Sequence, residues 1–324
     1  MTTFTHDAPH RNASRIGPGL GFAVVSATAF GLSGALAKGL LDTGWTAAAA
    51  VTARILIAAA VLVVPALVTL RGRWALIGRN LGLLTSYGVV AVAGCQLAYF
   101  NAVDHMQVGV ALLIEYTAPV AVMGWLWLRH GHRPGRLTVL GAVVAGAGLV
   151  LVLDLVSGAD LSVVGVVWGL GAMLGAATYF VLSADEDNGL PPIVLAAGGL
   201  VLGGATLLLA GLVGVVPLRA SVDPVDFAGW TVPCWLPVLV LGVVTAALAY
   251  VTGIAAGRRL GSRLASFVAL TEVLAALVFA WLLLDELPLT IQFVGGALIL
   301  VGVVTVKLGE SDVSEMPVEA GTLP

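Results

Sequence analysis

The sequence predicts an all-α integral membrane protein with ten transmembrane helices, arranged as two inverted five-helix repeats. Three observations predict this fold class: the composition, the spacing of the apolar segments, and a match between the two halves of the chain. Of the 324 residues, 59% are hydrophobic and only 10% are charged. Because a soluble domain carries about a quarter charged residues, most of this protein's surface has to face lipid.

Ten apolar segments are long enough to cross a bilayer, whose hydrocarbon core of about 30 Å needs about 20 helical residues. Short separators rich in charge, glycine and proline divide these segments, and none of them is long enough to hold a soluble domain. The predicted spans are 18–40, 46–70, 81–102, 108–128, 137–155, 162–183, 192–216, 235–256, 264–284 and 289–307.

The polar ends of the chain, residues 1–17 and 308–324, are predicted to be disordered tails. The first resembles the start of a signal peptide, because two arginines precede an apolar run. A similar segment recurs at 165–183, where no signal peptide can lie, so we interpret the first run as a retained helix. The sequence GPGLG at 17–21 is interpreted as a flexible entry to that helix.

Lysine and arginine gather on one side of the predicted topology. If the N-terminus lies inside, twelve of them fall in inner loops and tails, whereas Arg219 alone falls outside; Lys38 and Arg54 lie in the ends of spans. Cytoplasmic segments carry such an excess, so we expect a multi-pass protein of the cell membrane with both termini in the cytoplasm. The twelve are Arg11, Arg15, Arg71, Arg73, Arg79, Arg129, Arg133, Arg136, Arg258, Arg259, Arg263 and Lys307.

The two halves of the chain match at a displacement of 154 residues (242 − 88), which aligns 88–152 with 242–306 without a gap. Fifteen of the 65 aligned pairs are identical, against about a tenth expected for so biased a composition. The identical pairs include Gly88 with Gly242, Trp127 with Trp281, Pro134 with Pro288, Gly141 with Gly295, and Gly148 with Gly302.

This match divides the chain into a first repeat, 18–155, and a second repeat, 162–307, each with five predicted spans. Because five is odd, the two repeats enter the membrane in opposite directions. Inverted repeats are a recurrent plan of secondary transporters, whose binding site lies near the middle of the membrane between the repeats. The repeat therefore favours a carrier that works by alternating access.

The end of each repeat resembles a known unit. The first copy reads VGVALLIEYTAPVAVMGWLWL and RHGHRPGRLTVLGAVVAGAGLVLV, and the second reads ASFVALTEVLAALVFAWLLLDELPLTIQFVGGALILVGVV. Both resemble the repeat of the drug/metabolite transporter superfamily, specifically its EamA family of ten-helix carriers, over residues 18–307. The second copy carries Glu272, DELP at 285–288, Gly295 and Gly302, whereas the first has His132 in place of the acidic residue after the fourth span. The segment LLIEYTAP resembles members that export amino acids such as threonine and homoserine.

Glu115 and Glu272 are the two acids that fall well inside predicted spans. A carboxylate in lipid is costly unless it is protonated, paired or faces water, so such residues are functional candidates. Pro119 has no N–H and is predicted to kink the fourth span, which frees the carbonyl of Glu115 four residues earlier. That carbonyl and the carboxylate suit an ammonium group or a proton. The alternative is a structural pair, in which either acid bonds a nearby hydroxyl or Arg54.

Other polar side chains at similar depth are candidate substrate contacts, because lipid offers them no partner. Tyrosines can equally anchor a helix at the membrane interface. Arg54, about two turns into the second span, can pair with an acid or an anionic substrate group, or extend toward the membrane surface. Together with Arg54, Glu115 and Glu272, the candidate substrate and proton-coupling residues are Gln96, Tyr99, Asn101, Tyr116, Tyr179 and Tyr250.

The sequence lacks the motifs of several common enzyme classes. The chain has no phosphate-binding G-x-x-x-x-G-K-[ST], no H-E-x-x-H and no G-x-S-x-G. His130 and His132 are two loop imidazoles without further ligands, and Cys95 and Cys234 give neither a disulfide framework nor a metal spacing. Cys95 is interpreted as a small apolar residue. We expect no enzyme activity, metal, cofactor or nucleic-acid partner.

The leading function is a secondary carrier for a small polar metabolite, coupled to protons through the intramembrane acids. Its expected partners are the substrate and the lipid bilayer, and a homodimer is left open. The resemblance adds that the carrier exports an amino acid. The alternatives within transport are uptake, or flipping of a lipid-linked sugar. From other classes, an intramembrane enzyme lacks its catalytic set, and a non-transporting scaffold has no use for two intramembrane acids.

Overall fold

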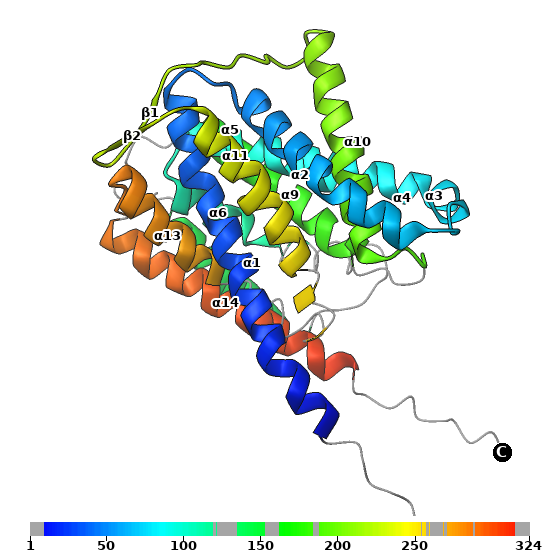
Figure 1. The fold of residues 1–324 in the computed structure, drawn as a ribbon. Coiled ribbons are helices and arrows are strands. Elements are labelled where there is room, and N and C mark those ends of the chain that lie inside the picture. Colours follow the sequence, from blue (N-terminus) through cyan, green and yellow to red (C-terminus); the bar gives the residue numbers. More distant parts are fainter. Residues whose placement is uncertain are drawn as a thin grey trace, which may run out of the picture.

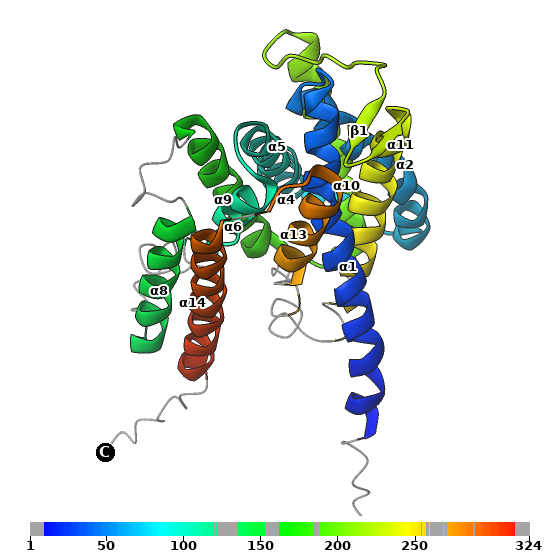
Figure 2. The same cartoon turned by 90° about the vertical axis from the view of Figure 1, so that its left-hand side faces the viewer.

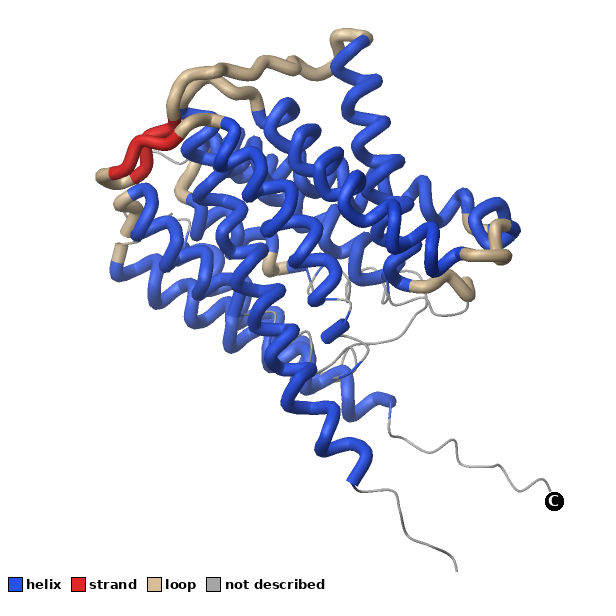
Figure 3. Tube along the Cα trace, in the orientation of Figure 1, coloured by secondary structure: helices blue, strands red, loops and turns tan. Residues whose placement is uncertain are grey.

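A computed structural model of the chain describes residues 10–118, 121, 135–152, 162–183, 188–253, 255–256, 259, 268, 271–287 and 289–314. Almost all of these residues are helical, and two short strands form a hairpin (Figure 3). The hairpin lies at one end of the bundle, and the start of α1 (His10–Asp42) and the end of α14 (Thr290–Ser314) lie at the other (Figures 1 and 2). We call the first of these the hairpin end.

The part of the chain before residue 153 begins with two long helices joined by a tight loop at the hairpin end. Thr46 precedes the second helix, and its hydroxyl oxygen accepts from the N–H of Ala49, which is ordinary helix capping. The helices after α1 are α2 (Ala47–Leu70), α3 (Ala75–Arg79), α4 (Leu81–Ser86), the π-helix η1 (Tyr87–Gly94), α5 (Cys95–His105), α6 (Val108–Glu115) and α8 (Arg136–Val152).

The part after residue 161 adds the hairpin between two groups of helices. Strands β1 (Val225–Phe227) and β2 (Trp230–Val232) pair antiparallel, and Gly229 between them has a φ of 82°, which glycine adopts without strain. The helices are α9 (Val163–Ser183), α10 (Pro192–Leu212), α11 (Trp235–Gly242), the π-helix η2 (Val243–Leu248), α13 (Thr271–Leu284) and α14.

Among the described residues, five helical segments are long and apolar enough to cross a membrane: Gly17–Asp42, Ala47–Leu70, Leu81–His105, Pro192–Leu212 and Trp235–Gly253. Four shorter apolar segments join them: Arg136–Leu151, Val163–Tyr179, Thr271–Leu284 and Thr290–Thr305. All of these fall on predicted spans. The fourth predicted span, 108–128, is described only as far as residue 118 and at 121, so the count of ten stays a prediction.

The outer faces of these helices are apolar rather than charged. Val64 of α2, Val143 of α8 and Val167 of α9 are each more than half exposed. In water, contiguous apolar surface of this kind would drive association. On a membrane protein it is the surface that lipid covers.

The prediction of disordered tails is wrong for the parts that the structure describes. Helix α1 begins at His10 and runs through Gly17 and Pro18 without a break, and α14 continues to Ser314. A glycine costs a helix only about 1 kcal/mol relative to alanine, and extending a long helix by one residue needs no new nucleus. GPGLG is therefore a helical segment and not a flexible entry.

Four helix pairs hold the bundle together: α1 with α13, α2 with α10, α5 with α9, and α8 with α14. In Figure 2, α8 and α14 run side by side along one flank. Glycines permit the close approach, because a Cβ on Gly148 would lie 2.6 Å from the carbonyl oxygen of Gly295. A Cβ on Gly175 would lie 2.5 Å from that of Cys95 in the α5–α9 pair. The helices of these two pairs thus approach closely at small residues, as membrane helices commonly do.

Both π-helical segments interrupt a helix at the same point of the 154-residue displacement. In η1, the N–H of Cys95 donates to the carbonyls of Val90 and Val92. At the end of η2, the N–H of Ala249 donates to Val244 and Ala246, and these residues are each 154 positions further along (249 − 95, 244 − 90, 246 − 92). In both places the donor skips the carbonyl four residues before it, which a regular α-helix would use.

Candidate functional site

Polar side chains from five elements far apart in the sequence converge inside the bundle. Arg54 comes from α2, Glu115 from the end of α6 and Glu272 from the start of α13. Hydrogen bonds and electrostatic interactions join these three to the rest of the group. We call this group the central polar cluster; its members are Arg54, Cys95, Gln96, Tyr99, Glu115, Tyr116, Thr245, Tyr250 and Glu272.

Arg54 is the most deeply buried charge of this cluster, with 2% of its surface exposed. Its Nη1 donates to the side-chain oxygen of Gln96, and its Nη2 donates to the carbonyl oxygen of Thr245 at 2.7 Å. The ring of Phe100 lies 5.7 Å from the guanidinium carbon, within reach of a cation–π contact. The alternative in which Arg54 extends to the membrane surface is therefore wrong, because its head group points into the bundle.

The π-helical segment η2 explains why the backbone carbonyl of Thr245 can accept a hydrogen bond from Arg54. In an α-helix the oxygen of Thr245 would accept from the N–H of Ala249, four residues later. That N–H instead donates to Val244 and Ala246. The oxygen of Thr245 thus loses its regular donor and turns to the guanidinium of a helix 191 residues earlier. π-Helical segments inside α-helices occur frequently at functional sites.

Glu115 is the last residue of α6, which ends there without reaching Pro119. The thiol of Cys95 lies 3.5 Å from its Oε1 and 3.4 Å from the carbonyl oxygen of Ala172. A thiol is a weak donor, so this contact compensates a carboxylate only slightly. Pro119 itself, with the predicted kink, lies outside the described residues.

Glu272 is the second residue of α13, where a negative charge is favoured by the helix dipole. The hydroxyl of Tyr116, from the turn after α6, donates to its Oε2 at 2.9 Å. This bond joins residues 156 positions apart. It is the hydroxyl pairing that the sequence left open as an alternative for this acid.

The charges of the cluster influence one another without touching. Arg54 interacts electrostatically with both Glu272 and Glu115, and with the hydroxyl groups of Tyr250 and Tyr99. Within the described residues, however, Arg54 makes no ion pair; the ion pair found there joins Lys38 to Asp42. A buried cation and two partly buried acids thus share one region and are held apart by neutral partners.

Of the remaining candidates, Tyr250 belongs to the cluster, whereas Tyr179 and Asn101 do not. Tyr179 of α9 borders it, with its ring 5.8 Å from that of Tyr87 and its hydroxyl in electrostatic contact with Glu272. Tyr250 packs edge-on against Phe30 of α1 at 5.3 Å. Asn101 forms no hydrogen bond with a described residue of the cluster, and its amide instead donates to the carbonyl of Leu97 in its own helix.

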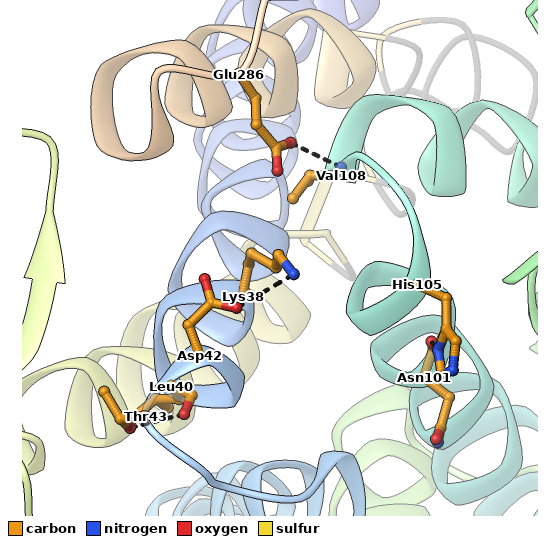
Figure 4. Close-up of polar contacts among 8 residues, drawn as sticks. All are labelled: Lys38, Leu40, Asp42, Thr43, Asn101, His105, Val108 and Glu286. Carbon is orange, nitrogen blue, oxygen red and sulfur yellow. Dashed lines mark hydrogen bonds and ion pairs between the residues drawn. The ribbon is translucent and has the colours of Figure 1, made fainter. Parts of the chain in front are cut away.

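A second group of charges lies at the hairpin end (Figure 4). Lys38 and Asp42, one turn apart on α1, form an ion pair of 3.2 Å. Glu286, in the link between α13 and α14, accepts at 3.1 Å from the N–H of Val108, the first residue of α6. Burial raises the pKa of the Glu286 carboxyl above its ordinary value, while the Val108 N–H and the charge of Lys38 oppose that rise.

Sequence reasoning missed three participants. Cys95 was expected to be a small apolar residue, yet its thiol contacts Glu115. Thr245 contributes a backbone oxygen, which no side-chain pattern reveals. Glu286 lies in the DELP segment quoted for the family resemblance, but its capping of α6 needs a contact across 178 residues. For Thr245, the sequence offered one indirect signal. Gly88-Val89-Val90 aligns with Gly242-Val243-Val244, which immediately precedes Thr245, but the alignment does not predict that the Thr245 carbonyl accepts a hydrogen bond from Arg54.

No group of three metal-ligating side chains occurs among the described residues. His130 and His132 lie outside them. The carboxyl, guanidinium and phenol groups of the cluster are chemically able to form hydrogen bonds and charge–charge interactions with a polar ligand.

Comparison with known proteins bears on the fold and the family of this chain. An uncharacterized transporter of Archaeoglobus fulgidus is 30% identical over 206 residues, which cover 64% of this chain and 69% of the relative. A solved structure titled "Crystal structure of protein" has the same fold, with a TM-score of 0.58 and 19% identity over 92% of this chain and 98% of the other. Residues 17–154 and again 163–308 match the EamA-like transporter family. Since these two matches cover most of the chain, this membrane protein belongs to the EamA-like transporter family.

Proposed function

We propose that this transporter is a secondary carrier that exports a small polar metabolite such as an amino acid, by alternating access between two inverted repeats. The central polar cluster carries the proposal. Its charges come from both repeats, since Arg54 and Glu115 belong to 18–155 and Glu272 belongs to 162–307. Buried charges that are not paired with one another are expensive, and a site for a polar cargo is a reason to keep them.

The matched π-helical turns support the inverted repeats. The backbone donors Cys95 and Ala249 skip equivalent carbonyls 154 residues apart. One turn faces the cluster through Gln96, and the other faces it through Thr245. A twofold axis through the cluster would produce two copies of the same π-helical distortion. The two copies here lie close to Arg54, which bonds Gln96 after the first and Thr245 within the second.

The α8–α14 pair supports the same symmetry. A Cβ on Gly148 would meet Gly295 and Ile299, and a Cβ on Gly302 would meet Gly141 and Ala145. Subtracting 154 from the second-repeat numbers turns one set of contacts into the other. Reciprocal contacts of this kind are the mark of a twofold-related interface.

The acids are proposed to couple transport to protons. Glu115 and Glu272 have neutral hydrogen-bond partners, a thiol and a phenol. Each acid can therefore exchange a proton for a cationic group of the cargo without breaking an ion pair. We assign substrate or proton contact to these two acids and, around them, to Arg54, Gln96, Tyr99, Tyr116, Tyr179 and Tyr250.

The orientation and the location follow from the distribution of basic residues. We propose ten spans in the cell membrane with both termini in the cytoplasm, because Lys and Arg concentrate in the segments of that side. The hairpin end then faces outward. Export of an amino acid rests on the likeness of LLIEYTAP to amino-acid exporters. An importer or a flippase would use the same cluster and differs in the direction or the cargo of flux.

The test is flux into proteoliposomes with and without a pH gradient, for a panel of labelled amino acids. Wild-type protein should move at least one of them at a rate that depends on the gradient. Glu115→Gln keeps the shape of the side chain and should abolish gradient-driven flux while expression and insertion persist. Asp226→Asn, in the exposed hairpin, is the matched control. If Glu115→Gln transports at the wild-type rate with unchanged pH dependence, the coupling role is wrong.

A further inference from the structure

Arg54 has hydrogen-bonding capacity that the protein does not use. Two of its three nitrogens donate, to Gln96 and to Thr245. The third, Nε, is buried and has no hydrogen-bond partner among the described residues, and the residue as a whole is only 2% exposed. Buried donors are nearly always satisfied, so an unpartnered Nε–H on a buried cation marks a place where an acceptor is missing.

The two bonds that Arg54 does make orient it without neutralising it. An amide oxygen and a backbone carbonyl carry no net charge, so the guanidinium keeps its full positive charge inside the bundle. These acceptors fix the plane of the group and leave Nε without a bond among the described residues, while each terminal nitrogen keeps a second N–H. The Nε and the neighbouring terminal nitrogen form a fork that fits a carboxylate through two parallel hydrogen bonds.

The acids of the cluster do not fill that place. Glu115 lies against the thiol of Cys95, and Glu272 accepts from Tyr116. Both act on Arg54 only through space, and within the described residues neither forms an ion pair with it. The cluster thus presents a positive edge and, separated from it, a negative region.

We propose that Arg54 binds the carboxylate of the transported molecule through Nε and an adjacent terminal nitrogen, and that the cargo is a small zwitterion whose cationic group faces Glu115 and Glu272. This rests on the proposed carrier function and adds the residue that recognises the carboxylate of the cargo. A molecule with opposite charges at its two ends compensates the charge of Arg54 and that of the two acids at the same time. A simple amine or a simple anion balances only one.

The positions of Arg54 and Glu272 on different helices also explain how bound cargo can favour one conformation of the carrier. Arg54 sits on α2 of the first repeat, and Glu272 sits on α13 of the second. A zwitterion held at both ends contacts Arg54 on α2 as well as the acids on α6 and α13, whereas a molecule lacking the carboxylate contacts only the acids. Binding energy is then available to bias one conformation of the carrier over another, because only a ligand with different affinity for two states can shift them.

The test is competition binding to the purified protein in nanodiscs. The probes are labelled threonine, leucine and glutamine, and the competitors are the same amino acids and their amino alcohols, in which CH₂OH replaces the carboxylate. We expect the alcohol to compete at least tenfold more weakly than the acid, since a bidentate charge-assisted contact is lost. This comparison uses wild-type protein and does not depend on the folding of a variant.

Variants then assign the effect to Arg54. Arg54→Gln should weaken binding of the amino acid at least tenfold and remove the preference for acid over alcohol, and Arg54→Lys should restore part of both. Arg73→Gln is the control, because Arg73 is exposed and bonds the carbonyl of Thr69 in the preceding helical turn. It should bind as the wild type does.

Each outcome decides the inference. A preference for the acid that disappears in Arg54→Gln supports it. Equal competition by acid and alcohol overturns it, and so does failure of all three amino acids to bind. Proton-driven flux of an amine or another cargo that lacks a carboxylate would also overturn it while leaving the proposed carrier standing, so the two proposals fail in different ways.

Discussion

Charged residues meet in two regions of this protein, and the two regions treat them in opposite ways. At the hairpin end, Lys38 pairs with Asp42 one turn away, and Glu286 caps the first turn of α6 (Figure 4). In the central polar cluster, Arg54 and Glu272 lie near each other but bond to neutral groups. The charged side chains at the hairpin end thus bond to a charge or to a helix N-terminus, whereas those of the central polar cluster have no oppositely charged partner among the described residues and remain able to bind a charged ligand.

The difference separates charges that stabilise the fold from charges that cost it stability. An exposed ion pair and a helix cap each contribute at most about 1–2 kcal/mol and need no ligand to explain them. A buried guanidinium without a carboxylate partner lowers the stability of the protein unless something compensates it. We therefore expect changes in the centre to alter transport and changes at the end to alter stability.

Of the contacts compared here, the largest effect is expected for the bond between Tyr116 and Glu272, which joins the two repeats inside the cluster. Glu272→Gln should lower the flux of the transported amino acid at least tenfold, because it removes the acid. Tyr116→Phe should lower it about threefold to tenfold, since one hydrogen bond to a charged group is lost. Flux into proteoliposomes, normalised to inserted protein, measures both.

The double variant sharpens this prediction. If the two side chains act through their bond, Tyr116→Phe should have little further effect in Glu272→Gln protein, and the two losses should not add. Melting temperatures of the three variants should stay close to that of the wild type. A large drop in melting temperature with flux preserved would show that the Tyr116–Glu272 pair stabilises the fold and does not serve transport. The proposed difference between the cluster and the hairpin end would then be wrong.

An intermediate effect is expected at Glu286. Glu286→Ala removes the acceptor of the Val108 N–H and should destabilise the protein by about 1 kcal/mol, the usual cost of losing a helix cap. Glu286→Gln keeps an acceptor and should cost less. Thermal unfolding in detergent measures the change, and transport by the folded fraction should be unaltered.

The pH dependence at Glu286 has a definite sign. Its pKa is raised in the folded protein, so its contribution to stability is fully present below the ordinary pKa and is lost as the pH rises through the folded one. Wild-type protein should therefore lose stability relative to Glu286→Gln as the pH rises above about 4.5. A difference that is the same at every pH would show that burial of this carboxyl does not matter.

The smallest effect is expected for the ion pair on α1. Lys38 and Asp42 are four residues apart, and Asp42 is more than half exposed. Such pairs contribute about 0.2–0.5 kcal/mol, and less when the basic residue comes first. Asp42→Asn should thus shift unfolding only slightly, should lose even that shift in high salt, and should leave transport unchanged. A flux defect in Asp42→Asn would show that the hairpin end also takes part in transport.

Side-chain type and depth were enough to single out most of the central polar cluster. Glu115, Glu272 and Arg54 stand out because each is ionisable within an apolar run. Asn101 looked equivalent to Gln96 on the same span, but its amide bonds the preceding turn of its own helix. Sequence position gives the depth of a residue and not the direction in which its side chain finds a partner.

The sequence by itself determined the helical membrane fold, because too few charges are present to cover a water-facing surface. It also determined where most spans lie, since a bilayer demands apolar segments of one length. Only the tertiary structure decided which groups meet. The Tyr116–Glu272 bond, the turn of Arg54 toward the carbonyl of Thr245 and the capping of α6 by Glu286 all join residues more than 150 positions apart. Such contacts depend on helix packing and on a local change in backbone hydrogen bonding, neither of which leaves a periodic signal in the sequence.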